Sequence, residues 1–380
     1  MNILIIPDKF KGSLSGAEVI AAIAEGIRAV DDHIKVHHII ASDGGDGFLH
    51  SIENNHPCLD SIACQTTDPL GREIQSKYLF DAQANCAYVE MAKASGMELL
   101  SAAERNPMLT STRGTGVLIA DAIARGAETI FVGLGGSATN DGGVGIAAAL
   151  GYRFIDPQGT EIDPVGGQLQ QIASIDASGR LPALDHVRVV AINDVANPLL
   201  GDEGAAAVYA PQKGADEDMV AQLELGLANL DQVVQRDLGI AAADVAGAGA
   251  AGGTGYGLKV FLQAEYQSGI EFVLSLTGTE RLLAGGAVDL IITGEGRIDD
   301  QTAYGKLVHG VSVVGEKYGV PVAAVCGQLA MQQKTIHDLG LRRVIQIHDP
   351  ERDLEFTIQN AKSLLVDAAS QLIRPFQSSQ

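Results

Sequence analysis

Apolar segments of strand length alternate with helical patterns at both ends of this 380-residue chain. Near the start, Ser15 and Glu18 have the spacing of a capping box, and aliphatic residues follow at helical intervals up to residue 30. Strands that alternate with helices are typical of a parallel sheet covered on both faces. The two chain ends together supply five strand candidates for such a sheet, and the pattern alone leaves open whether both ends share one sheet. The strand candidates are NILII (2–6), IKVHHII (34–40), VDLIITG (288–294), VPVAAVCG (320–327) and LRRVIQIH (341–348).

The middle of the chain is less regular. It mixes antiparallel-looking pieces such as SKYLFD (76–81) and CAYVEMA (86–92) with helical patterns such as TGVLIADAIARGA (115–127). A chain of this length exceeds the usual size of one domain. Two domains are therefore the default expectation, and residues 64–286 are the less regular part.

The charge of the chain limits its partners. The 26 lysines and arginines and 47 aspartates and glutamates give a formal charge of −21 that is spread along the sequence. Such a charge disfavours nucleic acid and anionic membrane surfaces as partners, whereas local cations still allow an anionic metabolite. No apolar run has the length of a signal-peptide core or a membrane span, so we expect a cytoplasmic protein.

Three loops follow strand candidates and combine cations with carboxylates. Ligands of open parallel sheets bind outside the carboxyl ends of the strands, where the strand order reverses. This rule selects PDKFKGS (7–13), SDGGDG (42–47) and TGEGRIDDQT (293–302). Phosphoryl transfer needs such a mixture of charges, although each charged residue taken alone could be a solvated turn residue. The candidate binding residues here are Ser13, Asp43, Gly44, Gly45, Glu295, Gln301 and Thr302, and the candidate catalytic residues are Lys11, Arg297, Asp299 and, just beyond, Lys306.

A fourth candidate segment, the glycine-rich stretch VGLGGSATNDGGVGIAAALG (132–151), predicts a strand, a loop and a helix. Such a loop can offer backbone N–H groups and the positive end of the helix dipole to a phosphate. A purely structural glycine turn explains the pattern equally well. The stretch matches neither the Walker A pattern nor the G-x-G-x-x-G fingerprint. Its candidate binding residues are Gly135, Gly136, Ser137, Asn140 and Asp141.

The segment AINDVANPLLG (191–201) follows another strand candidate. Asp194 and Asn197 could both face one metal ion or one sugar-like hydroxyl group. The alternative is that these residues only shape a turn before Pro198. Further along, PQKGAD adds Lys213 as a cation beside small residues.

Eight segments, in order and spacing, resemble the bacterial glycerate kinases that serve glyoxylate and galactarate or glucarate breakdown, the type-1 family. Small departures occur at Lys9, Asp46 and Cys326, and none removes a charge. The resemblance implies ATP-dependent phosphorylation of D-glycerate with Mg²⁺, with 2-phosphoglycerate favoured as the product. It also implies a discontinuous, flavodoxin-like α/β domain built from both chain ends (1–63 and 287–380) and a restriction-enzyme-like α/β insertion (64–286). The segments are PDKFKGSLS, SDGGDG, RNPMLTSTRGTG, GLGGSATNDGGVG, DVANPLLG, PQKGA, GAGAAGGTGYGL and ITGEGRIDDQTAYGK.

These observations give one main hypothesis and two alternatives. We expect a kinase site between the domains, where Lys11, Arg297 and Lys306 hold the anionic substrates. Asp299 is the expected general base, Asp194 and Asp46 are the expected Mg²⁺ ligands, and a homodimer is possible. The alternatives are a protein that senses a sugar acid without catalysis and a Rossmann-type dehydrogenase, although the missing fingerprint disfavours the latter.

Overall fold

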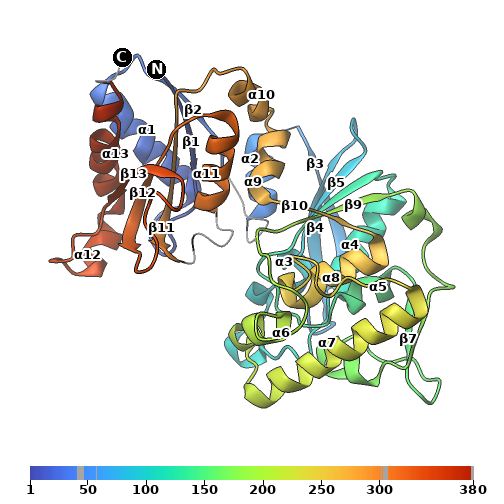
Figure 1. Cartoon of the computed structure of the whole chain (residues 1–380). Coiled ribbons are helices and arrows are strands. Elements are labelled where there is room, and N and C mark those ends of the chain that lie inside the picture. The colour runs from blue at the N-terminus through green and yellow to red at the C-terminus, as the bar shows by residue number, and fades with distance from the viewer. Residues whose placement is uncertain (41–46, 57, 301, 303–306, 378–380) are drawn as a thin grey trace. The chain divides into compact units, whose positions relative to one another are not determined.

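The computed structural model describes residues 1–40, 47–56, 58–300, 302 and 307–377. The chain forms two compact units (Figure 1). Unit 1 comprises Met1–Ser42, Asn54–His56 and Gly269–Gln380, and unit 2 comprises Asp43–Glu53 and Pro57–Ser268. The predicted domain boundaries remain a prediction about which segments fold independently. None of the helices that the structure describes is long and apolar enough to cross a membrane.

Unit 1 contains a five-stranded parallel sheet in the order β13-β12-β11-β1-β2. Strands from the two chain ends are direct neighbours, because Ile3 of β1 pairs with Leu290 of β11. The prediction that both ends share one parallel sheet is therefore confirmed. The chain passes from β1 to β2 in one direction and from β11 to β13 in the other, so the strand order reverses between β1 and β11. The strands are β1 (Asn2–Pro7), β2 (Lys35–His38), β11 (Leu290–Asp299), β12 (Val322–Ala330) and β13 (Leu341–Gln346).

Helices cover both faces of this sheet (Figure 1). The predicted capping box starts α1: the Ser15 N–H donates to the Glu18 carboxylate (2.8 Å), and the Ser15 hydroxyl accepts from the Glu18 N–H (3.3 Å). Helices α1 and α13 approach closely, because a Cβ at Gly26 would lie only 2.3 Å from the Val366 carbonyl oxygen. The helices of this unit are α1 (Gly16–Val30), α9 (Gly269–Leu276), α10 (Thr279–Ala284), α11 (Leu307–Tyr318), α12 (Leu354–Gln359) and α13 (Ala361–Gln377).

Unit 2 contains a six-stranded mixed sheet in the order β10-β9-β6-β5-β4-β3. The predicted antiparallel pieces are β4 and β5, which pair antiparallel, whereas β5, β6, β9 and β10 run parallel. The strands are β3 (Asp60–Thr67), β4 (Glu73–Asp81), β5 (Cys86–Glu90), β6 (Thr129–Gly133), β9 (Arg188–Ile192) and β10 (Glu265–Gln267), and a separate hairpin pairs β7 (Arg153–Ile155) with β8 (Ser174–Asp176). The helices here are α3 (Ala92–Ser95), α4 (Arg113–Ala124), α5 (Val144–Ala149), α6 (Ala205–Tyr209), α7 (Glu217–Leu238) and α8 (Ala250–Leu262), and α2 (Phe48–Asn55) starts in this unit. Short 3₁₀ helices are η1 (Met97–Leu99), η2 (Ala102–Glu104), η3 (Gly166–Gln171), η4 (Pro182–Asp185) and η5 (Pro211–Lys213).

Two glycine-rich segments of unit 2 pack backbone against backbone. The first is residues 134–143, which we call the glycine loop, between β6 and α5; the second is residues 247–257. The Gly142 N–H donates to the Gly252 carbonyl oxygen at 3.1 Å. A Cβ at Gly252 would lie 2.1 Å from the Thr139 carbonyl oxygen, and one at Gly257 would lie 2.4 Å from that of Gly142. These glycines therefore permit a backbone approach that any side chain would block.

We predict that Gly252→Ala destabilises the protein much more than Gly239→Ala. Both glycines have positive φ, +69° and +71°, but an added Cβ at Gly239 meets no atom within 4 Å. Both substitutions carry the strain of a left-handed alanine, and only Gly252→Ala adds a clash with the backbone of the glycine loop. The clash should cost about 1–3 kcal/mol more free energy of unfolding. Urea unfolding of both variants measures the difference, and equal midpoints would contradict the packing argument.

Candidate active site

The loop after β1 lies against β11 at the point where the strand order of unit 1 reverses. The Asp8 N–H donates to the Gly294 carbonyl oxygen at 2.8 Å. Further along, a Cβ at Gly296 would lie 3.5 Å from the backbone nitrogen of Lys11. The structure therefore brings the predicted loops around Lys11 and Glu295 together at this edge. Lys11 is exposed, so its ammonium group can meet a ligand from solvent.

The segment from Glu295 to Asp299 was expected in a loop, and this expectation is wrong. Strand β11 continues to Asp299 because residues 295–299 pair with 326–330 of β12. Side chains alternate along a strand, so Glu295, Arg297 and Asp299 share one side of β11. The Arg297 Nε lies 3.4 Å from the Asp299 Oδ2, which forms the predicted pair of a cation and a carboxylate.

Thr302 links two of the predicted site residues. Its hydroxyl donates to the Glu295 carboxylate at 2.7 Å and accepts from the Asp299 N–H at 3.1 Å. Thr302 is fully buried, and Glu295 is 7% exposed. In this structure the Thr302 hydroxyl therefore bonds to protein groups, and these bonds orient the Glu295 carboxylate and the end of β11.

Among the described residues, the other site residues predicted in the three strand-end loops show no contact that points to a ligand. The Ser13 hydroxyl donates to the Phe10 carbonyl oxygen at 3.1 Å, inside its own turn. Six predicted site residues lie outside the described residues: Asp43, Gly44, Gly45, Asp46, Gln301 and Lys306.

In unit 2, the glycine loop and the segment containing Asp194 leave neighbouring parallel strands. Gly133 of β6 pairs with Ile192 of β9, and the Leu134 N–H donates to the Ile192 carbonyl oxygen at 3.2 Å. Both segments therefore start at the same edge of the sheet, as the rule for parallel strands requires. Asp194 is half-buried, two residues after the end of β9.

Asn197 uses its side-chain amide inside the loop that follows. Its Oδ1 accepts from the Tyr209 hydroxyl at 2.7 Å, and its Nδ2 donates to the Glu203 carbonyl oxygen at 2.7 Å. These bonds fix the turn around Pro198, which fits the turn-shaping alternative that the sequence left open.

Asp141 is a fully buried carboxylate in the glycine loop. It accepts from the Thr112 N–H (2.7 Å), the Thr112 hydroxyl (2.8 Å), the Gly143 N–H (3.1 Å) and the Gly145 N–H (3.2 Å). Burial raises the pKa of Asp141, and these hydrogen bonds act in the opposite direction. Asp141 thus takes up N–H groups at the start of α5 that the sequence suggested for phosphate, and it ties α5 to the start of α4.

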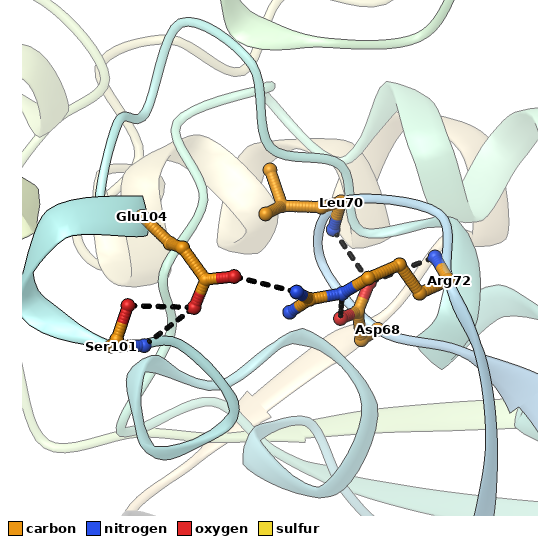
Figure 2. Close-up of polar contacts among 5 residues, drawn as sticks. All are labelled: Asp68, Leu70, Arg72, Ser101 and Glu104. Carbon is orange, nitrogen blue, oxygen red and sulfur yellow. Dashed lines mark hydrogen bonds and ion pairs between the residues drawn. The ribbon is translucent and has the colours of Figure 1, made fainter.

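The segment before α4, residues 105–112, is held at its other end by a cluster of charged side chains (Figure 2). The buried Asp68 carboxylate accepts from the Arg72 N–H at 2.9 Å and from its Nε at 2.5 Å. Arg72 also donates to Glu104 at 2.6 Å, and Glu104 accepts from the Ser101 N–H and hydroxyl at 2.8 Å. Ser101 and Arg72 lower the pKa of Glu104 to about 2. Glu104 and Arg72 therefore stay charged at neutral pH, and their hydrogen bonds hold the start of this segment.

Sequence reasoning missed Glu90, the last residue of β5. It is fully buried and accepts from the Gly47 N–H (3.2 Å) and the Leu49 N–H (2.9 Å) at the start of α2. Lys93 Nζ lies 3.4 Å away. The sequence signal is a single glutamate inside the apolar run CAYVEMA, at the end of a strand.

Lys213 was noted in the sequence but assigned no role. It is 2% exposed, and its Nζ donates to the Ser137 hydroxyl at 2.9 Å and to the Thr139 carbonyl oxygen at 2.6 Å. Burial lowers the pKa of Lys213 to about 7, and the charge of Asp141 opposes this shift. A buried lysine therefore holds the glycine loop through hydrogen bonds to Ser137 and Thr139.

The described residues contain no group of three or more His, Cys, Asp or Glu side chains that could hold a metal ion. Mg²⁺ in enzymes of phosphate chemistry is commonly bound by one or two carboxylates together with substrate phosphates. Asp194 offers one such oxygen ligand.

Comparisons with known proteins agree over nearly the whole chain. A family model described as the Glycerate kinase family matches residues 3–377. A glycerate kinase from Bacillus subtilis (strain 168) is 40% identical over 363 residues, covering 95% of this chain and 94% of the relative. A glycerate 2-kinase from Escherichia coli (strain K12) is 40% identical over 347 residues, covering 91% and 90%. A crystal structure from Salmonella typhimurium LT2, described as a candidate glycerate kinase 2, superposes with a TM-score of 0.82 at 38% identity and covers 100% of this chain and 99% of that one.

We predict that Lys213 makes the free energy of unfolding rise with pH above neutrality. The folded pKa of about 7 lies below the ordinary value of 10.5, so between these values the unfolded chain binds a proton that the folded chain lacks. Relative to Lys213→Met, the wild type should gain about 2 kcal/mol between about pH 7 and pH 9. Urea unfolding of both proteins at the two pH values measures this gain. A constant difference between them would show that Lys213 does not titrate in this range.

Proposed function

The chain belongs to the glycerate kinase family, and we propose that it transfers the γ-phosphoryl group of ATP to the 2-hydroxyl of D-glycerate. The products would be 2-phosphoglycerate and ADP, in organic-acid catabolism. The choice of the 2-hydroxyl is supported by the relative named glycerate 2-kinase. Membership of this kinase family removes the basis for the dehydrogenase and for the non-catalytic acid sensor.

The observation that carries the proposal is the edge between β1 and β11, where cations and carboxylates lie on adjoining segments. Lys11 and Arg297 are exposed there, and Asp299 lies beside Arg297. The two cations suit the glycerate carboxylate and the polyphosphate, because charge-assisted hydrogen bonds are the stronger ones. Lys306 is proposed for the same role from the sequence alone.

We assign Asp299 as the general base. Its carboxylate would take the proton of the glycerate hydroxyl while the hydroxyl oxygen forms a bond to the γ-phosphorus and the bond from phosphorus to ADP breaks. The side chain is 19% exposed, so substrate can reach it. Thr302 and the β11–β12 pairing hold the backbone at this position.

Mg²⁺ is proposed as the metal of the reaction, with Asp194 as its described ligand and Asp46 as a second ligand proposed from the sequence. A half-buried aspartate two residues after the end of a strand fits this cation, which prefers carboxylate and phosphate oxygens. When bound, the ion would supply positive charge to the phosphates. Asp194 would contribute one oxygen ligand to it.

We also propose that unit 1 is flavodoxin-like. Numbered along the chain, its strand order β2-β1-β11-β12-β13 reads 2-1-3-4-5, the order of flavodoxin-type sheets. The restriction-enzyme-like nature of the insertion remains a proposal that rests on the sequence resemblance.

Phosphorus NMR of the reaction product tests the proposed function. Incubation of the protein with D-glycerate, ATP and Mg²⁺ should give a new phosphate ester whose signal is split into a doublet by the single proton on C2. A triplet, from the two protons on C3, would show 3-phosphoglycerate and overturn the assignment of the 2-hydroxyl. No ester at all would overturn the activity.

In the same assay, Asp299→Asn should lower kcat by about 10²–10⁴ with little change in KM, as expected when a general base is lost. Asp338→Asn is the matched control, because Asp338 is an exposed carboxylate of the same unit that bonds only to Thr335 among the described residues. A folded Asp299→Asn variant with the kcat of the wild type would contradict the assignment.

A further inference from the structure

Three buried side chains of the glycine loop have hydrogen-bonding capacity that the described residues do not use. Ser137 is 5% exposed, and Thr139 and Asn140 are fully buried. Within the described part of the chain, the Thr139 hydroxyl and both polar atoms of the Asn140 amide lack a hydrogen-bond partner. Buried polar groups without partners are costly and rare. Their presence on neighbouring residues of one loop indicates a partner outside the described residues.

Lys213 determines what Ser137 can offer to such a partner. The Lys213 Nζ donates to the Thr139 carbonyl oxygen, which can only accept, and to the Ser137 hydroxyl oxygen. Because the Ser137 oxygen accepts from Lys213, its own hydrogen remains available for donation. No acceptor for this hydrogen occurs among the residues that the structure describes. Ser137 is therefore set as a donor.

The ligand that fits these groups is an anionic oxygen. The Ser137 hydroxyl and the Asn140 Nδ2 are donors, and the Lys213 Nζ, which forms no ion pair with a described carboxylate, adds a positive charge when it is protonated. Gly135 and Gly136, next to Ser137, are partly exposed, so the loop reaches the surface there. Both proposed substrates carry anionic oxygens, in the phosphates of ATP and in the carboxylate of glycerate.

We propose that Lys213 is a positioning residue that presents the Ser137 hydroxyl, with the Asn140 amide three residues further along the same loop, as a donor to an anionic oxygen of one substrate. The inference rests on the proposed function for the identity of the substrates. It adds Lys213, which lies 76 residues from Ser137 in the chain, to the residues on which substrate binding depends.

Direct binding measurements on the full chain test the proposal. Calorimetry with a non-hydrolysable ATP analogue and, separately, with D-glycerate should show that Ser137→Ala binds one of the two about ten- to a hundredfold more weakly. Lys213→Met should weaken the same ligand. Weaker binding of the ATP analogue identifies a phosphate oxygen, and weaker binding of glycerate identifies the carboxylate. In steady-state assays the KM of that substrate alone should rise.

Ser312→Ala is the matched control for loss of a buried hydroxyl. Ser312 is also 5% exposed, but its hydroxyl donates to the Val308 carbonyl oxygen inside α11. This variant should bind both ligands as the wild type does. If Lys213→Met does not fold, the calorimetric affinities of Ser137→Ala alone test the proposal. Unchanged affinity of a folded Ser137→Ala for both ligands would overturn the inference, whereas failure of the proposed function would appear as absence of phosphoglycerate with the wild type.

Discussion

The close backbone contact between the glycine loop and residues 247–257 is the constraint on which the structure of unit 2 depends. Gly142 and Gly252 are joined by a hydrogen bond, and an added Cβ at Gly252 or Gly257 would penetrate the opposite backbone. The contact holds the loop that leaves β6, and Asp141 then ties this loop to the start of α4. Much of the bare backbone in this loop thus serves the packing of the protein itself.

This constraint separates two kinds of polar group in the glycine loop. Asp141 is saturated by four donors from the protein, so it stabilises the loop from within. Asn140 and Thr139 are equally buried but lack such partners among the described residues. The hydrogen bonds of Asp141 explain why the loop has one conformation. The side chains of Thr139 and Asn140 indicate where the loop binds a ligand.

Unit 1 follows a different principle, in which the register of the sheet positions the site residues. Strand β11 extends beyond the end of β1, so its last five residues pair only with β12 in the described sheet. The loop after β1 occupies the space beside Gly296. Alternation along β11 then places Arg297 and Asp299 on the same side of the strand, at the edge where the backbone of the loop containing Lys11 lies against Gly296.

Local features of the fold could be predicted from the sequence, and features that depend on distant residues could not. The five aliphatic strands of unit 1 and the capping box at Ser15 follow from short-range patterns. The extension of β11 through Arg297 was missed, because its charged residues suggest a loop until β12 is known to pair with them. The Lys213–Ser137 bond and the buried Glu90 were missed because each depends on partners more than 40 residues away in the chain.

Amide hydrogen exchange of the ligand-free protein tests most directly whether the glycine loop is formed by the protein's own contacts. The N–H groups of Gly142, Gly143 and Gly145 donate to the Gly252 carbonyl oxygen and to the Asp141 carboxylate. If these contacts hold the loop, the three amides should exchange as slowly as those of β6, through the same large opening of unit 2. Exchange as fast as in exposed turns, with slowing only after ATP or glycerate is added, would show that the ligand forms the loop and would contradict this account.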